Sequence, residues 1–215
     1  MKNGSRSDGA RLWAEAQALA RLAQAVRGGE RSRVPALLFF TDPDRTPRPW
    51  EVAARMPPGS GVVYRGFGRP EALDEARRLR TVTQEQGMAL LIGEQADLAE
   101  AVGADGLHLP ERALTAASSL VERRPAWILT GAVHSVAAAW AARDLDAVIL
   151  SPIFQAGGTS VARPALGLDA LSAAASGTVP VFALGGISAR TAGWLAGTGC
   201  GGLAGVSGVA SAFDA

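Results

Sequence analysis

Eight short runs of almost entirely apolar residues, separated by stretches of helical pattern, constrain this chain more than any other feature. The runs cover residues 34–40, 61–65, 88–92, 105–109, 126–130, 146–150, 179–184 and 201–206. A strand that is apolar along its whole length belongs in a parallel sheet covered on both faces, because a strand with one wet face alternates polar and apolar residues. Eight such strands, each followed by a helix, predict a compact (β/α)8 TIM barrel.

The segments between the runs have helical spacing. They are 48–55, 70–86, 95–102, 112–122, 135–143, 167–176 and 188–196. The clearest is 70–86, which opens on Pro70 and carries acidic residues before basic ones, as the N1 preference of proline and the helix dipole favour. Ser188 is a good N-cap residue and is expected to begin the helix at 188–196.

One further helix is expected ahead of the first strand. Apolar residues recur at helical spacing through 10–27, and the pair Gly28 and Gly29 should end the helix. We expect residues 1–33 to form an N-terminal extension with this extra helix, packed on the domain or across one end of it. Residues 34–215 should then form a single barrel domain. The same helix is a candidate contact for a homodimer.

An open, doubly wound sheet is the alternative arrangement of such units. It would need a glycine-rich phosphate turn after the first strand, whereas residues 40–48 read FTDPDRTPR. The sequence therefore favours the closed barrel.

Composition excludes several classes of function. The formal net charge of +1 gives no reason to expect binding to nucleic acid. Cys200 is the single cysteine, so neither an intramolecular disulfide nor a cysteine zinc site is expected. No apolar run approaches the roughly 20 residues that cross a bilayer. The first residues lack the apolar core of a secretory signal, so we expect a cytoplasmic location.

Two glycine-rich turns follow the last two strands, where barrels often hold a phosphate. The segments are 183–188 (ALGGIS) and 205–211 (GVSGVAS). Glycines let backbone N–H groups approach an anion, and a helix N-terminus adds attraction. The alternative is that these glycines only permit tight turns. The candidate phosphate-binding residues are Gly185, Gly186, Ser207 and Gly208.

Other candidates lie at the C-terminal ends of the remaining strands, where barrel active sites are built. Arg65 suits an anionic ligand or a salt bridge at the rim. His134 either caps the following helix or contacts ligand, and His108 is interpreted as a packed structural group. Glu94 and Glu111 could form a carboxylate pair for a metal or for acid–base chemistry, although rim carboxylates are common.

Several motifs together resemble the thiamine phosphate synthase/TenI family, whose members are compact (β/α)8 barrels. They are DLAEAVGADGLHL (97–109), VHS (133–135), SPIF (151–154), PVFALGGIS (180–188) and GVSG (205–208), within a likeness that runs from 37 to 211. The resemblance implies that the two glycine turns hold a thiazole phosphate. In the synthases this compound is joined to a pyrimidine diphosphate, and pyrophosphate is released with the help of Mg²⁺.

The half of the family pattern that holds the diphosphate is not kept. Arg65 matches, but the family's glutamine, lysine, asparagine, metal-binding aspartate, serine and second lysine are replaced by Val63, Phe67, Gly93, Ala113, Ala132 and Ser160. The family's threonine beside that second lysine matches Thr159, a further pocket candidate. Lysines and Mg²⁺ compensate the charge of a departing diphosphate, so their loss predicts poor synthase activity. Mg²⁺ is expected only if that activity is retained, with Glu94 a weak ligand candidate, and no other cofactor is required.

The TenI-like relatives, which isomerise a thiazole carboxylate phosphate, offer a second interpretation. Their acid–base histidine aligns with Pro152, so His134 or Glu111 would have to move the proton instead. Three hypotheses follow: a divergent TenI-like enzyme acting on a thiazole phosphate or a similar small phosphorylated heterocycle, an active thiamine phosphate synthase, or a non-catalytic binder or regulator.

Overall fold

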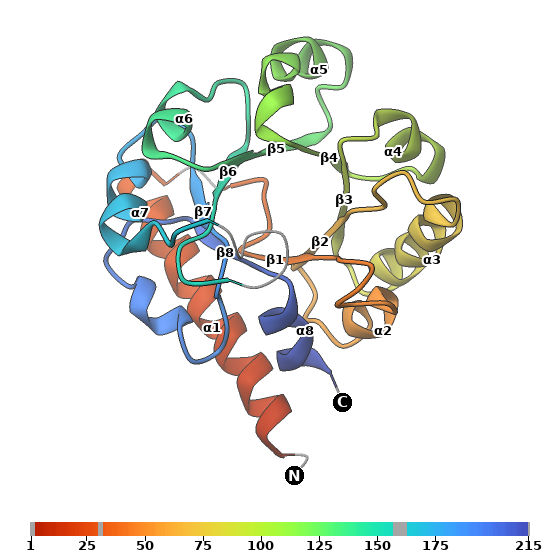
Figure 1. Ribbon diagram of the computed structural model, residues 1–215, viewed down its shortest axis with the longest axis horizontal. Helices are drawn as coiled ribbons and strands as arrows, with labels where there is room; N and C mark the ends of the chain where they lie inside the picture. Colours follow the sequence, from red (N-terminus) through yellow and green to blue (C-terminus); the bar gives the residue numbers. More distant parts are fainter. Residues whose placement is uncertain (1–2, 30–31, 157–162, 215) are drawn as a thin grey trace.

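Eight parallel strands close into a barrel in the order of the chain (Figure 1). The structure is a computed structural model that describes residues 3–29, 32–156 and 163–214. The strands are β1 (Leu37–Phe40), β2 (Gly61–Tyr64), β3 (Ala89–Gly93), β4 (Gly106–Leu109), β5 (Ile128–Val133), β6 (Ala147–Leu150), β7 (Val181–Ala183) and β8 (Gly202–Gly205). Phe39 of β1 pairs with Val62 on one side and Gly205 of β8 on the other, which closes the ring. The predicted TIM barrel is confirmed.

Helices surround the strands on the outside (Figure 1). They are α2 (Pro49–Ala53), α3 (Ala72–Glu85), α4 (Ala96–Val102), α5 (Ala117–Arg123), α6 (Val136–Ala141), α7 (Gly167–Ala175) and α8 (Ser207–Phe213), with a 3-10 turn η1 (Glu111–Ala116) ahead of α5. Leu38 and Phe40 face the barrel interior, whereas Leu37 and Phe39 belong to the layer beneath the helices. Both faces of each strand are therefore buried, which explains the unbroken apolar runs.

The connection between β7 and β8 differs from the expectation. The predicted helix at 188–196 is wrong, because only a 3-10 turn, η3 (Ala192–Leu195), forms there. Ser188 is not an N-cap: its backbone N–H donates to Thr191 Oγ1 at 3.0 Å, and that hydroxyl donates to the Gly186 carbonyl at 2.9 Å. These bonds hold a turn in place of a helical start, and Gly193 further weakens helix formation.

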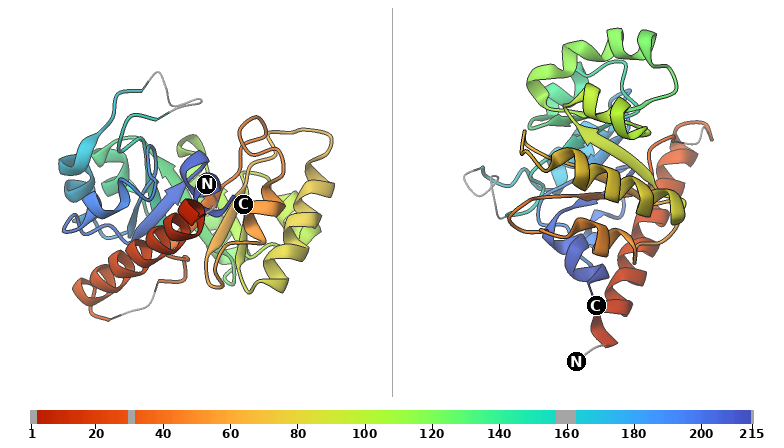
Figure 2. Two further views of the ribbon diagram at one scale, coloured as in Figure 1. Left: turned by 90° about the horizontal axis from the view of Figure 1, so that it is seen from below. Right: turned by 90° about the vertical axis from the view of Figure 1, so that its right-hand side faces the viewer.

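The N-terminal helix α1 (Asn3–Val26) lies beside α8 along the outside of β8 and β1 (Figures 1 and 2). It starts before the predicted 10–27 segment, although its first residues are weak helix formers. Gly9 explains the extension, because a Cβ there would lie 2.8 Å from the Ala212 carbonyl and 2.8 Å from the Phe213 ring. Close contact with α8 thus stabilises the first turns. The proposed boundary between residues 33 and 34 stays a prediction.

Replacing Gly9 with leucine should destabilise the fold by about 1–3 kcal/mol, because the new side chain forces α1 away from α8. Leucine is the better helix former, so any loss must come from the contact between helices. Urea unfolding of Gly9→Leu and of Ala14→Leu, a matched change at an exposed position of α1, measures the difference. Equal stability of the two variants would contradict this packing role.

Candidate active site at the mouth of the barrel

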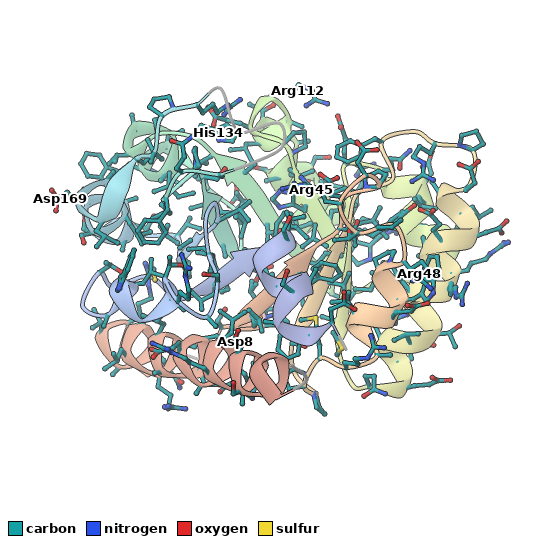
Figure 3. The ribbon with its side chains drawn as sticks, turned by 60° about the horizontal axis from the view of Figure 1, so that its bottom comes forward. Asp8, Arg45, Arg48, Arg112, His134 and Asp169 are labelled. Carbon is teal, nitrogen blue, oxygen red and sulfur yellow. The ribbon has the colours of Figure 1, made fainter. Side chains whose placement is uncertain are left out.

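A cavity of about 630 Å³ opens at the C-terminal ends of the strands. Its walls come from the ends of β1 to β7 and the residues that follow them: Phe40, Arg65, Phe67, Gly68, Gly93, Glu94, Gln95, His108, Pro110, Arg112, Ala132, His134, Ser151, Arg163 and Leu184. In Figure 3, Arg112 and His134 lie at this end, away from α1. A second cavity of about 610 Å³ lies between α1 and the other end of the barrel. Its Arg27 and Arg33 bind backbone carbonyls, so we place the site at the mouth.

Arg65 is held rigidly at the end of β2. Its Nε donates to the Thr41 carbonyl at 2.7 Å, and its Nη2 lies 3.6 Å from Asp42 Oδ2. The guanidinium also lies between the rings of Phe40 and Phe67, 5.6 Å and 5.4 Å from their centroids. Burial lowers the pKa of Arg65, and the Asp42 carboxylate opposes that shift. The structure thus shows the ion pair at the rim and places Arg65 in the cavity wall, and its contact with an anionic ligand stays a prediction.

The carboxylates near the mouth each have a partner within the chain. Glu94 forms an ion pair with Arg112. Glu111 accepts a hydrogen bond from the His134 backbone N–H at 2.8 Å. Asp42 binds Arg45 at 2.8 Å; burial raises its pKa, but the hydrogen bonds from Arg45 outweigh burial and hold the pKa below its ordinary value. Glu94 and Glu111 therefore bind different partners, Arg112 and the His134 backbone. The sequence had suggested that the two carboxylates could act together on a metal or in acid–base chemistry.

His134 is oriented by Ser151, which follows β6. Its Nδ1 lies 2.9 Å from the Ser151 carbonyl, a group that can only accept, so Nδ1 carries the proton. In the neutral ring Nε2 is then a proton acceptor, and no described residue is hydrogen-bonded to it. Because His134 lines the cavity, this imidazole can take a proton from a bound molecule.

His108 was interpreted as structural, yet it also lines the cavity. The residue is 8% exposed, its Nδ1 lies 3.0 Å from Thr130 Oγ1, and its ring forms a T-shaped pair with that of Phe40, with 4.9 Å between the ring centroids. Burial, followed by the nearby Arg65 cation, lowers the pKa of His108 to about 3. It is a neutral polar group of the wall. Leu107 and Leu109 pack beneath the helices, and the alternation along β4 therefore predicts that His108 points into the barrel or its mouth, as it does.

Two cavity residues have left-handed backbone conformations that side chains rarely adopt. Phe67 has φ of 49° and Glu94 has φ of 63°. Such conformations cost of order 1–3 kcal/mol and gather at functional sites. Phe67 is also 66% exposed, an unusual position for a phenylalanine. The sequence carries no signal for either conformation.

The two glycine turns interlock next to the cavity. Gly185 and Gly186 have φ of 97° and 66°. A Cβ on Gly186 would lie 2.6 Å from the Phe154 Cβ, and one on Gly208 would lie 2.0 Å from the Ile187 carbonyl. Ser207 is exposed at the start of α8, whose first amides have no partner within the helix. Leu184, beside these turns, lines the cavity, and Thr159 lies outside the described residues.

The donors at the mouth do not fit a Mg²⁺ ion. Mg²⁺ needs several oxygen ligands, but Glu94 is the single carboxylate among the described residues that line the cavity, and Ala113 supplies no oxygen from its side chain. Within the described ranges no group of three histidine, cysteine, aspartate or glutamate residues could hold a metal ion.

Comparison with known proteins identifies the family. The family model described as thiamine monophosphate synthase (TMP-TENI) matches residues 60–209. The chain belongs to this family. It is 34% identical over 147 residues to the thiamine-phosphate synthase of Methanoculleus marisnigri, covering 67% of this chain and 70% of that protein. It is 32% identical over 166 residues to the enzyme of Laribacter hongkongensis, covering 75% and 79%.

A solved structure supports the same family. The thiamine phosphate pyrophosphorylase from Pyrococcus furiosus superposes with a TM-score of 0.66 at 25% identity, covering 83% of this chain and 91% of that one. The resemblance seen in the motifs is thus confirmed. Among the described residues of this thiamine monophosphate synthase family member, no helix is both long and apolar enough to cross a membrane.

The buried His108 predicts a pH-dependent stability. The unfolded chain binds a proton at this group below its ordinary pKa of 6.5, whereas the folded chain does so only near 3. The free energy of unfolding should therefore fall, by up to about 1.4 kcal/mol per pH unit, as pH drops from 6.5 towards 3.

Urea unfolding of the wild type and of His108→Gln between pH 4 and 7 tests this, because every other titrating group is shared. The difference in the free energy of unfolding between the wild type and His108→Gln should become smaller as pH falls. A gap that stays constant would mean that His108 titrates normally.

Proposed function

We propose that this protein is a divergent, TenI-like member of the family that binds a thiazole phosphate or a similar small phosphorylated heterocycle and transfers a proton on it, in thiamine metabolism. The observation that carries the proposal is the orientation of His134. Its Nδ1 is committed to the Ser151 carbonyl, which leaves Nε2 as the acceptor on a side chain that lines the cavity.

The phosphate belongs at the interlocked glycine turns. A Cβ on Gly185 or Gly186 would collide with the segment 152–155, and a Cβ on Gly208 would collide with the Ile187 carbonyl, so the turn that carries Gly208 packs directly on the turn at 183–188. Free amides at the start of α8, next to Ser207, supply donors for an anion. The heterocycle would then reach past Leu184 into the cavity.

Proton transfer needs one base that can also return the proton. His134 Nε2 takes a proton from one atom of the ring and gives it back to another, so the atoms of substrate and product balance. Glu111, the other candidate, accepts the backbone N–H of His134. We therefore assign Glu111 to positioning the segment that carries His134.

Synthase activity is the less favoured function, because this chain lacks the lysines and the metal-binding aspartate that the family pattern places around a departing diphosphate. Phe67 replaces a family lysine, and Ala113 replaces the aspartate. Incubation with both synthase substrates and Mg²⁺ tests it directly. Release of pyrophosphate at a rate typical of enzymes would overturn our preference. The homodimer and the cytoplasmic location remain predictions.

The phosphate site predicts that Ser207→Asp weakens binding of thiazole phosphate at least tenfold, because a negative charge then faces the anion. Aspartate suits the first turn of a helix, so α8 should stay folded. Ser211→Asp, at an exposed position further along the same helix, is the control for added charge. Calorimetric titration measures both affinities, and equal effects of the two substitutions would rule out this site.

The assigned base predicts that His134→Gln lowers kcat for proton exchange on the thiazole carboxylate phosphate by about 10²–10⁴. The Kd for the ligand should change little, because the phosphate contacts remain. Hydrogen–deuterium exchange followed by NMR measures the rate. Ligand binding without exchange in the wild type would favour the non-catalytic binder, and full activity in the variant would remove His134 from the mechanism.

A further inference from the structure

The cavity at the mouth has an excess of positive charge. Arg65, Arg112 and Arg163 line it, whereas Glu94 is the one carboxylate among its described lining residues. An enclosed surface with this balance attracts anions. The glycine turns lie beside the cavity, so the arginines are available to a second negative group on the same ligand.

Arg112 is the arginine best placed to receive that group. It lies in η1, directly after β4, and its side chain is 70% exposed while ion-paired with Glu94, which is 52% exposed. An exposed ion pair of this kind contributes only about 0–1 kcal/mol. A ligand oxyanion can therefore replace the Glu94 carboxylate at small cost, and the planar guanidinium binds a carboxylate or phosphate through two parallel hydrogen bonds.

Glu94 is held in position by its backbone. Its N–H donates to the His108 carbonyl at 2.9 Å, and its left-handed φ of 63° turns the chain sharply after β3. The carboxylate thus stays next to Arg112 as a resident counter-ion. Arg65, fixed by Thr41 and Asp42, adds a second positive charge to the same cavity.

We propose that Arg112, with Glu94 as its displaceable counter-ion, binds an oxyanion of the ligand in this cavity without a divalent metal. The oxyanion is a carboxylate or a diphosphate. The guanidinium supplies the positive charge that a Mg²⁺ ion, held by carboxylates, would otherwise supply. The inference rests on the proposed function only in placing the ligand in this cavity, since it concerns a different anion from the one at the glycine turns.

Titration of the full chain with inorganic pyrophosphate, and separately with benzoate, tests the proposal by calorimetry in excess EDTA and in Mg²⁺. At least one probe should bind in EDTA with the affinity that it shows in Mg²⁺. Binding of pyrophosphate alone identifies the group as a diphosphate, and binding of benzoate alone identifies it as a carboxylate. Binding of neither probe in EDTA would overturn the proposal.

Two substitutions with opposite expected effects sharpen the test. Arg112→Gln should raise the Kd of the bound probe at least tenfold, because a charge-assisted hydrogen bond is lost. Glu94→Gln should lower that Kd by up to about fivefold, because the probe no longer competes with a carboxylate. Arg123→Gln, on α5 and bonded to the Ser119 carbonyl, is the control for net charge.

Weaker binding in Glu94→Gln would instead make Glu94 a ligand of a metal or of the substrate, and would refute the counter-ion role. Equal Kd values for Arg112→Gln and Arg123→Gln would refute the role of Arg112. Circular dichroism verifies that each exposed substitution leaves the fold intact. Probe binding that Ser207→Asp weakens and Arg112→Gln leaves intact would place the probe at the glycine turns, so a failure of this inference can be told apart from a failure of the phosphate site.

Discussion

Eight parallel strands close into a barrel, and both faces of the sheet are buried. This burial determines which positions of the chain can carry polar or charged side chains. Leu38 and Phe40 fill the interior while Leu37 and Phe39 pack beneath the helices, so a strand offers almost no position for a charge. At the mouth of the barrel, charged groups come from the residues that follow the strands, such as Arg65 and Glu94. The polar exception in the wall, His108 bonded to Thr130, is tolerated because the ring is neutral and hydrogen-bonded.

This constraint explains why the sequence predicted the fold so well and the site only in outline. Unbroken apolar runs are a local pattern, and all eight became strands of one barrel. The helix at 188–196 failed because Thr191 binds the turn before it, a contact that spacing does not reveal. The ion pair between Glu94 and Arg112 joins residues 18 apart, so it depends on how two strand ends meet. Sequence could list charged residues at the mouth, but could not assign their partners.

Those partners change what the site can do. The family pattern in this sequence lacks its lysines and its metal-binding carboxylate, which suggests that half of the site has lost its charged groups. In the structure, Asp42 and Glu94 at the mouth instead form ion pairs with arginines. Asp42 binds Arg45 and approaches Arg65, and Glu94 binds Arg112. Guanidinium groups remain charged at any physiological pH and present fixed planar donors. The cavity wall therefore keeps its positive charges at any physiological pH.

The two histidines that line the cavity have different surroundings. His108 is buried and close to Arg65, and its pKa of about 3 keeps it uncharged at neutral pH. It can therefore contact an uncharged part of a ligand but cannot act as a cationic acid. His134 is only half-buried, and the Ser151 carbonyl fixes its tautomer. A side chain fixed in one tautomer, at the wall of a cavity lined by arginines, has the geometry that the proposed proton transfer on a small anionic ligand requires.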